Sequence, residues 1–250
     1  MPENNKVIAI VQAHMDSTRL PGKVMKEICG KPMLLLMLER LSHSKLLNHI
    51  IVATTTNKND DIIYETAKKN GYGVFRGSEF DCLDRHYQVA KKFNVDFICK
   101  ITSDCPIIDP EVIDQVIDKF QNGSYDYVSN VHPATFPNGL DVEIFRFSAL
   151  EQAWKESTDP TEREHTTTYI WSNPSKFRLG NVVMHNGKNL FQSERWTVDY
   201  QEDFEFIKAI YENLYHNGRI FLMDEILNLL RKRKDVWKIN QHLVSFNMVH

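Results

Sequence analysis

The chain contains 250 residues, 42% of them hydrophobic, which is enough for one large α/β domain with a sizeable core. Its 30 Lys and Arg residues against 33 Asp and Glu residues give a formal net charge of −3, which provides no global basic field for nucleic acid. The four cysteines form neither a CxxC pair nor a zinc-ligand spacing, and no apolar run approaches the roughly 20 residues that cross a bilayer, so we expect a cytoplasmic protein without a membrane partner.

Short apolar runs alternate with helical patterns along the first half of the chain. Runs rich in β-branched residues predict strands at 6–13, 49–54, 73–75, 97–101 and 125–129. This alternation is typical of an α/β fold with a mostly parallel sheet that helices cover on both faces. In such a sheet, chemistry is expected in the loops that follow the strands.

Two helices between these strands have start signals in the sequence. Pro32 is expected in the first turn of one helix, where its missing N–H costs no hydrogen bond, and apolar residues at helical spacing continue through 33–41. Asp109 and Pro110 are expected to open another helix. Gly123 follows the apolar stripe of that helix and is predicted to cap its C-terminus.

The pattern becomes irregular in the second half of the chain. Residues 130–139 are rich in Pro, Asn and His and predict a loop, followed by a strand over 140–147 and a helix near 149–156. The parallel sheet is predicted to resume at 196–198. A last helix is predicted near 223–232, with a basic end that balances the helix dipole.

The loop after the first predicted strand carries the main chemical signal. Residues 17–23 read STRLPGK, so Arg19 and Lys23 lie four positions apart around a glycine turn. Two cations and several backbone N–H groups at the carboxyl edge of a sheet suit a nucleoside triphosphate. Arg offers a planar fork to two phosphate oxygens, and Lys a mobile charge. A basic surface turn is the alternative interpretation of these residues.

Two aspartates follow predicted strands, Asp104 after 97–101 and Asp199 after 196–198. Nucleotidyl transfer requires neutralisation of charge on the α-phosphate and on the departing pyrophosphate, commonly by Mg²⁺ between carboxylates and substrate oxygens. If these strands are neighbours in the sheet, both carboxylates face the basic loop. From the residues alone, each is equally consistent with an ordinary turn aspartate.

Asp141 and Glu143 alternate with apolar residues, so both side chains point the same way from the predicted strand. That arrangement suits recognition of hydroxyl groups, and an exposed polar strand face is the alternative. The sequence contains neither a GxSxG motif nor a GxxxxGK[ST] phosphate loop, which argues against a serine hydrolase and a P-loop ATPase.

Five segments, in order along the chain, resemble one family. Residues 7–32, VIAIVQAHMDSTRLPGKVMKEICGKP, are similar to the N-terminal signature of the cytidylyltransferases that activate acidic sugars, such as the acylneuraminate and 3-deoxy-manno-octulosonate cytidylyltransferases. Among these, the residues of this segment are most similar to the spore-coat polysaccharide cytidylyltransferase-like proteins. The likeness continues in TSDCP at 102–106, FPNGLDVEIF at 136–145, EREH at 162–165 and RWTVDYQEDFE at 195–205.

This resemblance implies a Rossmann-like nucleotide-diphospho-sugar transferase sheet, mostly parallel and flanked by helices, with a small inserted lobe. Residues 1–250 would form a single nucleotidyltransferase domain, in which about 131–195 form the acceptor and dimerisation lobe. The implied reaction transfers CMP from CTP to an acidic sugar or related acceptor and releases pyrophosphate, in surface polysaccharide biosynthesis. A homodimer would catalyse it by direct in-line displacement.

The resemblance also implies roles for individual residues. Catalysis would depend on Arg19, Lys23 and Asp104, and Mg²⁺ would be held by Asp104 and Asp199. The nucleotide would contact Ala13, His14, Ser17, Arg19, Lys23, Arg76 and Ser103. The acceptor would contact Asp141, Glu143, Glu164 and His165.

Two residues depart from the family pattern: His14 stands where Arg is usual, and Asp16 where Gly is usual. Exchanging a permanent cation for an imidazole and adding a carboxylate weakens phosphate binding at neutral pH. Asp16 has two other expected roles, pairing with Arg19 or helping to hold the metal. These departures motivate one alternative, a catalytically weakened relative that binds nucleotide as a regulatory module.

The other alternative is a nucleotide-sugar glycosyltransferase with the same sheet topology. That class usually presents an Asp-x-Asp metal motif. The sequence contains none, and Asp141-x-Glu143 is the nearest approach to one.

Overall fold

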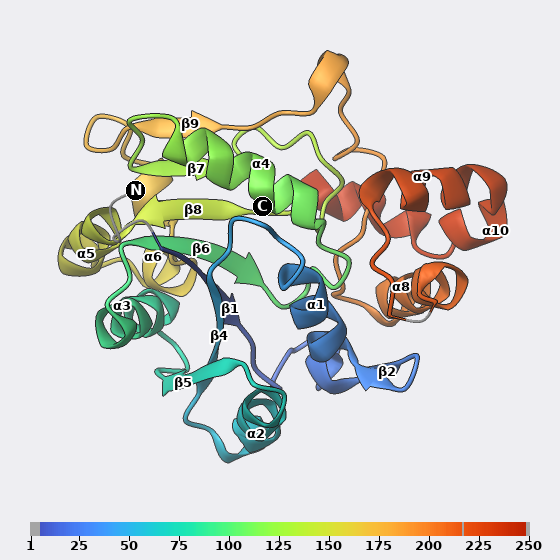
Figure 1. Cartoon of the computed structure of the whole chain (residues 1–250), viewed down its shortest axis with the longest axis horizontal. Coiled ribbons are helices and arrows are strands. Elements are labelled where there is room, and N and C mark those ends of the chain that lie inside the picture. The colour runs from blue at the N-terminus through green and yellow to red at the C-terminus, as the bar shows by residue number, and fades with distance from the viewer. Residues whose placement is uncertain (1–5, 217, 249–250) are drawn as a thin grey trace.

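A seven-stranded sheet forms the centre of the computed structural model, which describes residues 6–216 and 218–248 (Figure 1). Only β8 runs antiparallel to its neighbours in this sheet, so the sheet is mostly parallel, as predicted. In spatial order, its strands are β5 (Gly73–Gly77), β4 (His49–Thr55), β1 (Val7–Gln12), β6 (Phe97–Thr102), β8 (Glu143–Arg146), β7 (Tyr127–Ser129) and β9 (Leu179–Asn181). A separate small sheet pairs β2 (Glu27–Ile28) with β3 (Lys31–Pro32).

Helices cover both faces of the central sheet, because successive residues of a buried strand point to opposite sides. In β1, Val7 and Val11 belong to one hydrophobic cluster, whereas Ile8 and Ile10 belong to the other. The first cluster includes residues of α1 (Met33–Leu41), α2 (Asp61–Lys69), α4 (Pro110–Gln121), α8 (Gln201–Leu214), α9 (Met223–Lys232) and α10 (Lys234–Trp237). The second includes residues of α3 (Cys82–Phe93), α5 (Phe147–Glu156) and α7 (Thr168–Trp171). Helices α8, α9 and α10 lie together at one side of the molecule (Figure 1).

Short elements complete the chain. One more α-helix, α6, spans Pro160–Glu164. The 3-10 helices are η1 (Lys23–Met25), η2 (Lys58–Asp60), η3 (His185–Gly187) and η4 (Gln241–Met248). Residues 131–195, predicted as a lobe within the domain, supply β8 and β9 to the central sheet together with α5, α6 and α7.

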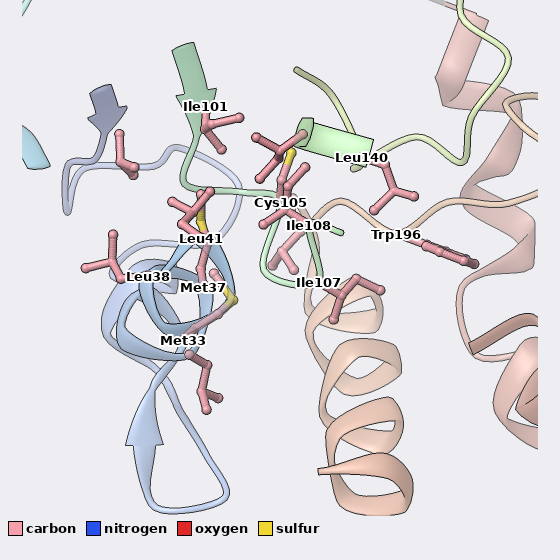
Figure 2. Packing of buried hydrophobic residues seen from close by; sticks show 14 of the residues in the cluster. Met33, Met37, Leu38, Leu41, Ile101, Cys105, Ile107, Ile108, Leu140 and Trp196 are labelled. Carbon is pink, nitrogen blue, oxygen red and sulfur yellow. The ribbon is translucent and has the colours of Figure 1, made fainter. Parts of the chain in front are cut away.

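The core beside α1 also fixes the loop that follows β6. Figure 2 shows apolar side chains of α1 next to those of β6 and this loop, and the same cluster reaches Leu140 and Trp196. All of these side chains are buried. Because Cys105 and Ile107 are anchored in this core, the position of Asp104 beside them is set by packing. The labelled members of the cluster are Met33, Met37, Leu38, Leu41, Ile101, Cys105, Ile107, Ile108, Leu140 and Trp196.

The five strands predicted in the first half of the chain are present, each with ends within two residues of the prediction. The start of α4 is also confirmed: the Asp109 carboxylate accepts the Glu111 N–H at 2.8 Å, and Pro110 is the first helical residue. Pro32 lies one residue before α1, at the end of β3, and not in the first turn.

The predictions at 123 and 140–147 need correction. The residue that caps α4 is Asn122, with φ −84°, and Gly123 is not among the glycines with positive φ. A side chain at Gly123 would collide with the ring of Tyr125, 2.2 Å from the position of a Cβ, so packing is what requires glycine there. The strand predicted over 140–147 is shorter, because β8 covers only Glu143–Arg146 and α5 begins at Phe147.

The parallel sheet does not resume at 196–198. Strand β6 already has β1 and β8 as neighbours, so it has no free edge for this segment. Instead, the N–H of Val198 donates to the carbonyl of Asp104 at 2.8 Å, and the N–H of Trp196 donates to the carbonyl of Asn138 at 2.6 Å. The segment therefore crosses the end of β6 as an extended loop, and Asp199 follows it.

No helix between residues 6 and 216 or between 218 and 248 combines the length and the apolar composition that a membrane crossing requires.

Candidate active site

Arg19 and Lys23, the two cations of the loop after β1, converge on Asp199. Arg19 Nη2 lies 3.0 Å from Asp199 Oδ1, and Lys23 Nζ lies 3.2 Å from the same oxygen. Lys23 Nζ also donates to the carbonyl of Val198 at 2.5 Å. The Arg19 side chain is 48% exposed and that of Lys23 only 11%. One cation is therefore fixed beneath the loop, and the other remains accessible to a ligand.

A third cation holds the other oxygen of Asp199. Arg195 Nη2 lies 3.0 Å from Asp199 Oδ2, and buried Asp203 holds Arg195 in place through two hydrogen bonds of 3.0 Å. Asp203 also accepts the N–H of Asp199 at 3.0 Å, at the first turn of α8. Burial favours the neutral acid, but Lys23, Arg19 and Arg195 outweigh burial and hold the pKa of Asp199 below its ordinary value. Asp199 is thus an ionised carboxylate between three cations.

Backbone geometry closes the basic loop into a compact turn. Gly22 adopts φ 70°, a left-handed conformation that glycine tolerates, and its N–H donates to the carbonyl of Met15 at 2.8 Å. The N–H of Met15 in turn donates to the buried Asp60 carboxylate at 2.7 Å. His14 and Asp16 are exposed on the outside of this turn. Asp16 accepts a hydrogen bond from Asn59 at 3.4 Å, while Arg19 pairs with Asp199 instead.

Asp104 is joined to the segment that carries Asp199. Its carbonyl accepts the N–H of Val198 at 2.8 Å and the hydroxyl of Thr197 at 3.2 Å. The structure therefore brings Asp104, Asp199, Arg19 and Lys23 to the same edge of the sheet, at the carboxyl ends of β1 and β6. Ala13 and Ser103, both buried, follow these two strands directly.

The carboxylates at this edge suit a divalent cation. Burial, and next the charge of Asp104, raise the pKa of Asp141 to about 7. Asp104 forms no ion pair within the described part of the chain. No set of three or more His, Cys, Asp or Glu side chains among residues 6–216 and 218–248 converges at metal-binding distances. A hard cation such as Mg²⁺ fits this oxygen donor set if the substrate supplies further oxygens.

Asp141 lines a cavity of about 340 Å³, which we call the acceptor cavity after the contacts predicted for its lining. Glu143 and His165 also line it, whereas Glu164 is exposed outside the lining, and contact of these residues with an acceptor stays a prediction. The remaining lining residues are Lys100, Thr102, Val131, His132, Ala134, Asn138, Thr167, Thr168, Trp171 and Phe191.

Both carboxylate oxygens of Glu143 already have a partner in the protein. Its Oε1 lies 2.5 Å from Lys100 Nζ, and its Oε2 accepts the hydroxyl of Tyr127 at 2.6 Å. Burial favours the neutral acid, but Lys100 outweighs burial and lowers the pKa of Glu143. The same ion pair raises the pKa of Lys100 although burial opposes its charge. Both groups are therefore charged, and each compensates the other.

Arg76 holds the backbone next to the site. Its guanidinium donates to the carbonyls of Thr55 at 2.9 Å and Asn57 at 2.8 Å, and pairs with Asp61 at 2.6 Å. These bonds fix the loop between β4 and α2 at the same edge of the sheet as Arg19. Contact of Arg76 with a nucleotide stays a prediction.

A larger cavity of about 700 Å³ lies at the opposite edge, around the amino ends of β1, β4 and β5. None of the residues predicted for the site lines it. Because ligands of open α/β sheets bind at the carboxyl ends of the strands, we place the active site at the smaller cavity and the basic loop.

The comparison with known proteins agrees with this arrangement. A family model described as Cytidylyltransferase matches residues 8–230. The chain belongs to the cytidylyltransferase family. It is therefore a nucleotidyltransferase, and the resemblance read from the sequence is confirmed.

Two relatives are similar to this cytidylyltransferase over nearly its whole length. The solved structure of a cytidylyltransferase from Leptospira borgpetersenii serovar Hardjo-bovis has 35% sequence identity and a TM-score of 0.85, covering 93% of this chain and 97% of that one. The spore coat polysaccharide biosynthesis protein SpsF of Bacillus subtilis is 32% identical over 243 residues, which are 92% of this chain and 96% of SpsF.

A more distant structure supports the fold alone. The CMP:2-keto-3-deoxy-manno-octonic acid synthetase, solved in complex with CTP, has 17% identity and a TM-score of 0.63, covering 83% of this chain and 99% of that one. The two solved structures thus confirm the predicted Rossmann-like α/β sheet of the cytidylyltransferase.

Sequence reasoning missed two groups of this cytidylyltransferase site. Lys100 is a single cation within the apolar run of β6, FICKIT, and that interruption was the available signal for a buried ion pair. Arg195 and Asp203 belong to the segment RWTVDYQEDFE at 195–205, but the sequence did not predict a role for either of them. Their spacing of eight residues gave no local sign that they brace Asp199 from the side opposite the basic loop.

Proposed function

We propose that this enzyme transfers CMP from CTP to a hydroxyl of an acidic sugar or related acceptor, with release of pyrophosphate, in surface polysaccharide biosynthesis. The observation that carries the proposal is the convergence of Arg19 and Lys23 on Asp199 at the carboxyl ends of β1 and β6, with a cavity lined by Thr102 and Asp141 at the same end of β6. Membership of the cytidylyltransferase family supports it, together with the name of one similar protein, from spore coat polysaccharide biosynthesis.

Arg19 and Lys23 are proposed to bind the triphosphate through the charges that now face Asp199. In the structure, both cations form ion pairs with Asp199 Oδ1, which takes the place that a phosphate oxygen would have in the proposed complex. Phosphates compete for Arg19 first, because its side chain is the more exposed of the two. Binding of CTP then frees Asp199 in part, while Arg195 keeps it in place.

Asp104 and the freed Asp199 are proposed to hold Mg²⁺ together with phosphate oxygens. When bound, the metal neutralises charge on the α-phosphate and on the pyrophosphate that leaves. The acceptor hydroxyl gives up its proton, for which His165 is the proposed acceptor, and attacks the α-phosphorus as the bond to the bridging oxygen breaks, so that the pyrophosphate keeps that electron pair. Arg19 and Lys23 stabilise the departing negative charge, so the chain acts through position and electrostatics.

The remaining contacts stay predictions within this proposal. His14, Ser17, Ala13, Ser103 and Arg76 are proposed for the nucleotide side of the site. Asp141, Glu143 and His165 are proposed for the acceptor side, with Glu164 at its entrance. The proposed form of the enzyme is a cytoplasmic homodimer in which residues 131–195 supply contacts.

Pyrophosphate release tests the proposal. Each of four nucleoside triphosphates is combined with Mg²⁺ and a panel of sugars and sugar acids, and CTP is expected to support release with at least one acceptor. Arg19→Ala should abolish release, whereas Lys232→Ala, an exposed cation at the end of α9, should leave it intact. CTP binding without turnover would favour the regulatory alternative. Release of a nucleoside diphosphate from a sugar nucleotide would favour a glycosyltransferase.

A further inference from the structure

The side chain of His165 lies at the acceptor cavity without a polar contact to hold it. It is exposed and lines the cavity. Within the described part of the chain, its imidazole forms neither a hydrogen bond nor an ion pair. A group that takes a proton must lie within hydrogen-bond reach of the hydroxyl that loses it. The backbone around His165 therefore decides whether this residue can serve as the proposed proton acceptor.

The chain makes a tight three-residue turn at this point, centred on Thr166. The carbonyl of His165 accepts the N–H of Thr167, and it also accepts the Thr167 hydroxyl at 3.3 Å. Thr166 adopts φ 44°, in the left-handed region that β-branched residues rarely occupy. A three-residue turn with positive φ at its centre is strained. The turn therefore persists only because the surrounding structure holds it.

A histidine of α3 holds Thr166. Both side chains are completely buried, and Thr166 Oγ1 lies 3.3 Å from His86 Nδ1. Nδ1 also lies 2.8 Å from the carbonyl of Cys82. Burial lowers the pKa of His86 to about 3, so its ring is neutral near pH 7. Because a carbonyl only accepts hydrogen bonds, Nδ1 carries the single ring proton and shares it between Cys82 and the hydroxyl oxygen of Thr166.

A second contact with α3 fixes the chain before His165. Arg163 Nε lies 2.7 Å from Asp81 Oδ2, and Asp81 is the N-cap residue of α3. Arg163 Nη1 also donates to the carbonyl of Ser157 at 3.1 Å. Both ends of the segment 163–166 are thus fastened to α3, and His165 lies between them.

This arrangement costs stability at two adjacent positions. The backbone of Thr166 is strained, and the buried Nε2 of His86 has no hydrogen-bond partner among the described residues. Packing alone would favour apolar side chains at both positions. Strain that the surrounding structure maintains is typical of functional sites. Here it is concentrated at a turn whose two flanking residues, His165 and Thr167, line the acceptor cavity.

We propose that His86 and Thr166 are positioning residues, which hold the imidazole of His165 where it takes the proton of the acceptor hydroxyl. The inference rests on the proposed function, because it uses His165 as the proton acceptor. His86 does not line the cavity, so it acts without touching the acceptor. Its effect passes through the hydroxyl and backbone of Thr166 to His165.

Hydrogen exchange at the Thr167 amide tests the turn without CTP or an acceptor. In the native turn, the His165 carbonyl holds this N–H. His86→Leu removes the contact to Thr166 and should speed exchange of this amide at least about tenfold, because local opening becomes easier. Thr166→Ser keeps the hydroxyl and should leave the exchange rate within about twofold of the wild type. Exchange at the wild-type rate in His86→Leu would overturn the inference.

Turnover and stability should respond differently to loss of the polar pair. His86→Leu combined with Thr166→Val replaces both partners by apolar side chains, so the melting temperature should not fall. The kcat of pyrophosphate release should fall at least about tenfold with an unchanged KM for CTP, because only the placement of His165 is lost.

Tyr169→Phe is the matched control for this double variant. It removes a buried hydroxyl that bonds Glu156, three residues beyond Thr166 and outside the cavity lining, and should leave kcat unchanged. A loss of kcat in the double variant that only accompanies a lower melting temperature would show a structural role and overturn the inference.

Removal of His165 decides whether the two residues act through it. In a His165→Ala background, the same double variant should cause no further loss of kcat, because no imidazole remains to be positioned. A further loss there, or normal turnover in His165→Ala itself, would overturn the inference and leave the proposed transfer of CMP standing. No release by the wild type with any acceptor, alongside faster Thr167 exchange in His86→Leu, would remove the proposed function and leave the hold of His86 on this turn established.

Discussion

The backbone carbonyl of Asp104 accepts the N–H of Val198 at 2.8 Å, which ties the loop after β6 to the segment that ends in Asp199. Through this bond, two aspartates far apart in sequence share one edge of the sheet. The basic loop after β1 reaches the same edge, because β1 and β6 are adjacent parallel strands. The order of the strands in the sheet therefore determines that these residues meet at one edge. Their side chains then determine the chemistry that this edge can perform.

Asp104→Asn should cut turnover by about two orders of magnitude, the scale of losing a major electrostatic contact in the transition state. The melting temperature should change little, because Asp104 forms no ion pair within the described residues. Steady-state pyrophosphate release at saturating Mg²⁺ measures the effect, with Asp118→Asn on the exposed side of α4 as control. Near-normal turnover would show that Asp104 is not a ligand.

Asp199→Asn should lower turnover to a similar degree and also destabilise the fold. The amide cannot balance Lys23 and Arg195, which are both largely buried beside it. Loss of one partner from such a pair costs about 3 kcal/mol in the free energy of unfolding. Denaturant titration of both Asn variants gives the comparison. Equal stability of the two variants would mean that the cations around Asp199 do not depend on it.

Arg19→Lys should reduce kcat/KM for CTP about tenfold even though the charge is kept, because the planar fork to two oxygens is lost. The guanidinium also stacks over Tyr200, 5.1 Å from the ring centroid, which orients the fork. Arg231→Lys, an exposed position on α9, is the matched control. If CTP kinetics are unchanged in Arg19→Lys, the pair Arg19 and Lys23 is a surface turn.

Glu143→Gln should destabilise the fold at neutral pH and not at low pH. Lys100 holds the pKa of buried Glu143 below its ordinary 4.5, so the carboxylate contributes stability above that pH and loses it as pH falls through the lower folded value. The difference in free energy of unfolding should be about 3 kcal/mol at pH 7 and shrink below pH 4. Denaturant titrations across pH measure it. The exposed pair of Glu151 and Lys155 gives a control, since Glu151→Gln should change stability by less than about 0.5 kcal/mol.

Much of the fold could be predicted because its signals are local. The strands at 49–55 and 97–102 are short runs rich in apolar and β-branched residues, and Asp109 with Pro110 is a helix start that needs no partner. The failure at 196–198 has a different cause. Trp196, Thr197 and Val198 all favour strands and predict one, but whether a strand edge is available depends on β8, which inserts antiparallel beside β6.

The site was partly predictable for the same reason. Residues of the basic loop are neighbours in sequence, so Arg19 and Lys23 could be proposed together. The network around Asp199 includes Arg195 and Asp203, whose mutual contacts depend on how α8 packs. The acceptor cavity has charges from β6 and β8, and the compensation of Lys100 by Glu143 is a pairing across strands that no local pattern reveals.

His14 is predicted to contact the nucleotide, in place of the Arg that is usual in the family. Its side chain is exposed, as is that of Asp16. If it contacts the triphosphate, CTP binding should strengthen as pH falls from 8 to 5, because imidazole gains its charge in that range and the phosphates favour the charged form. His14→Arg should tighten binding at pH 7.5 and remove most of this pH dependence, whereas His14→Ala should weaken binding at pH 6. Calorimetric titration with CTP at several pH values measures all three proteins.

His43→Ala, at an exposed histidine beyond the end of α1, should keep the wild-type profile. Identical profiles in wild type and both His14 variants would show that this residue does not touch the nucleotide, and the basic loop would then bind phosphate through Arg19 and Lys23 alone.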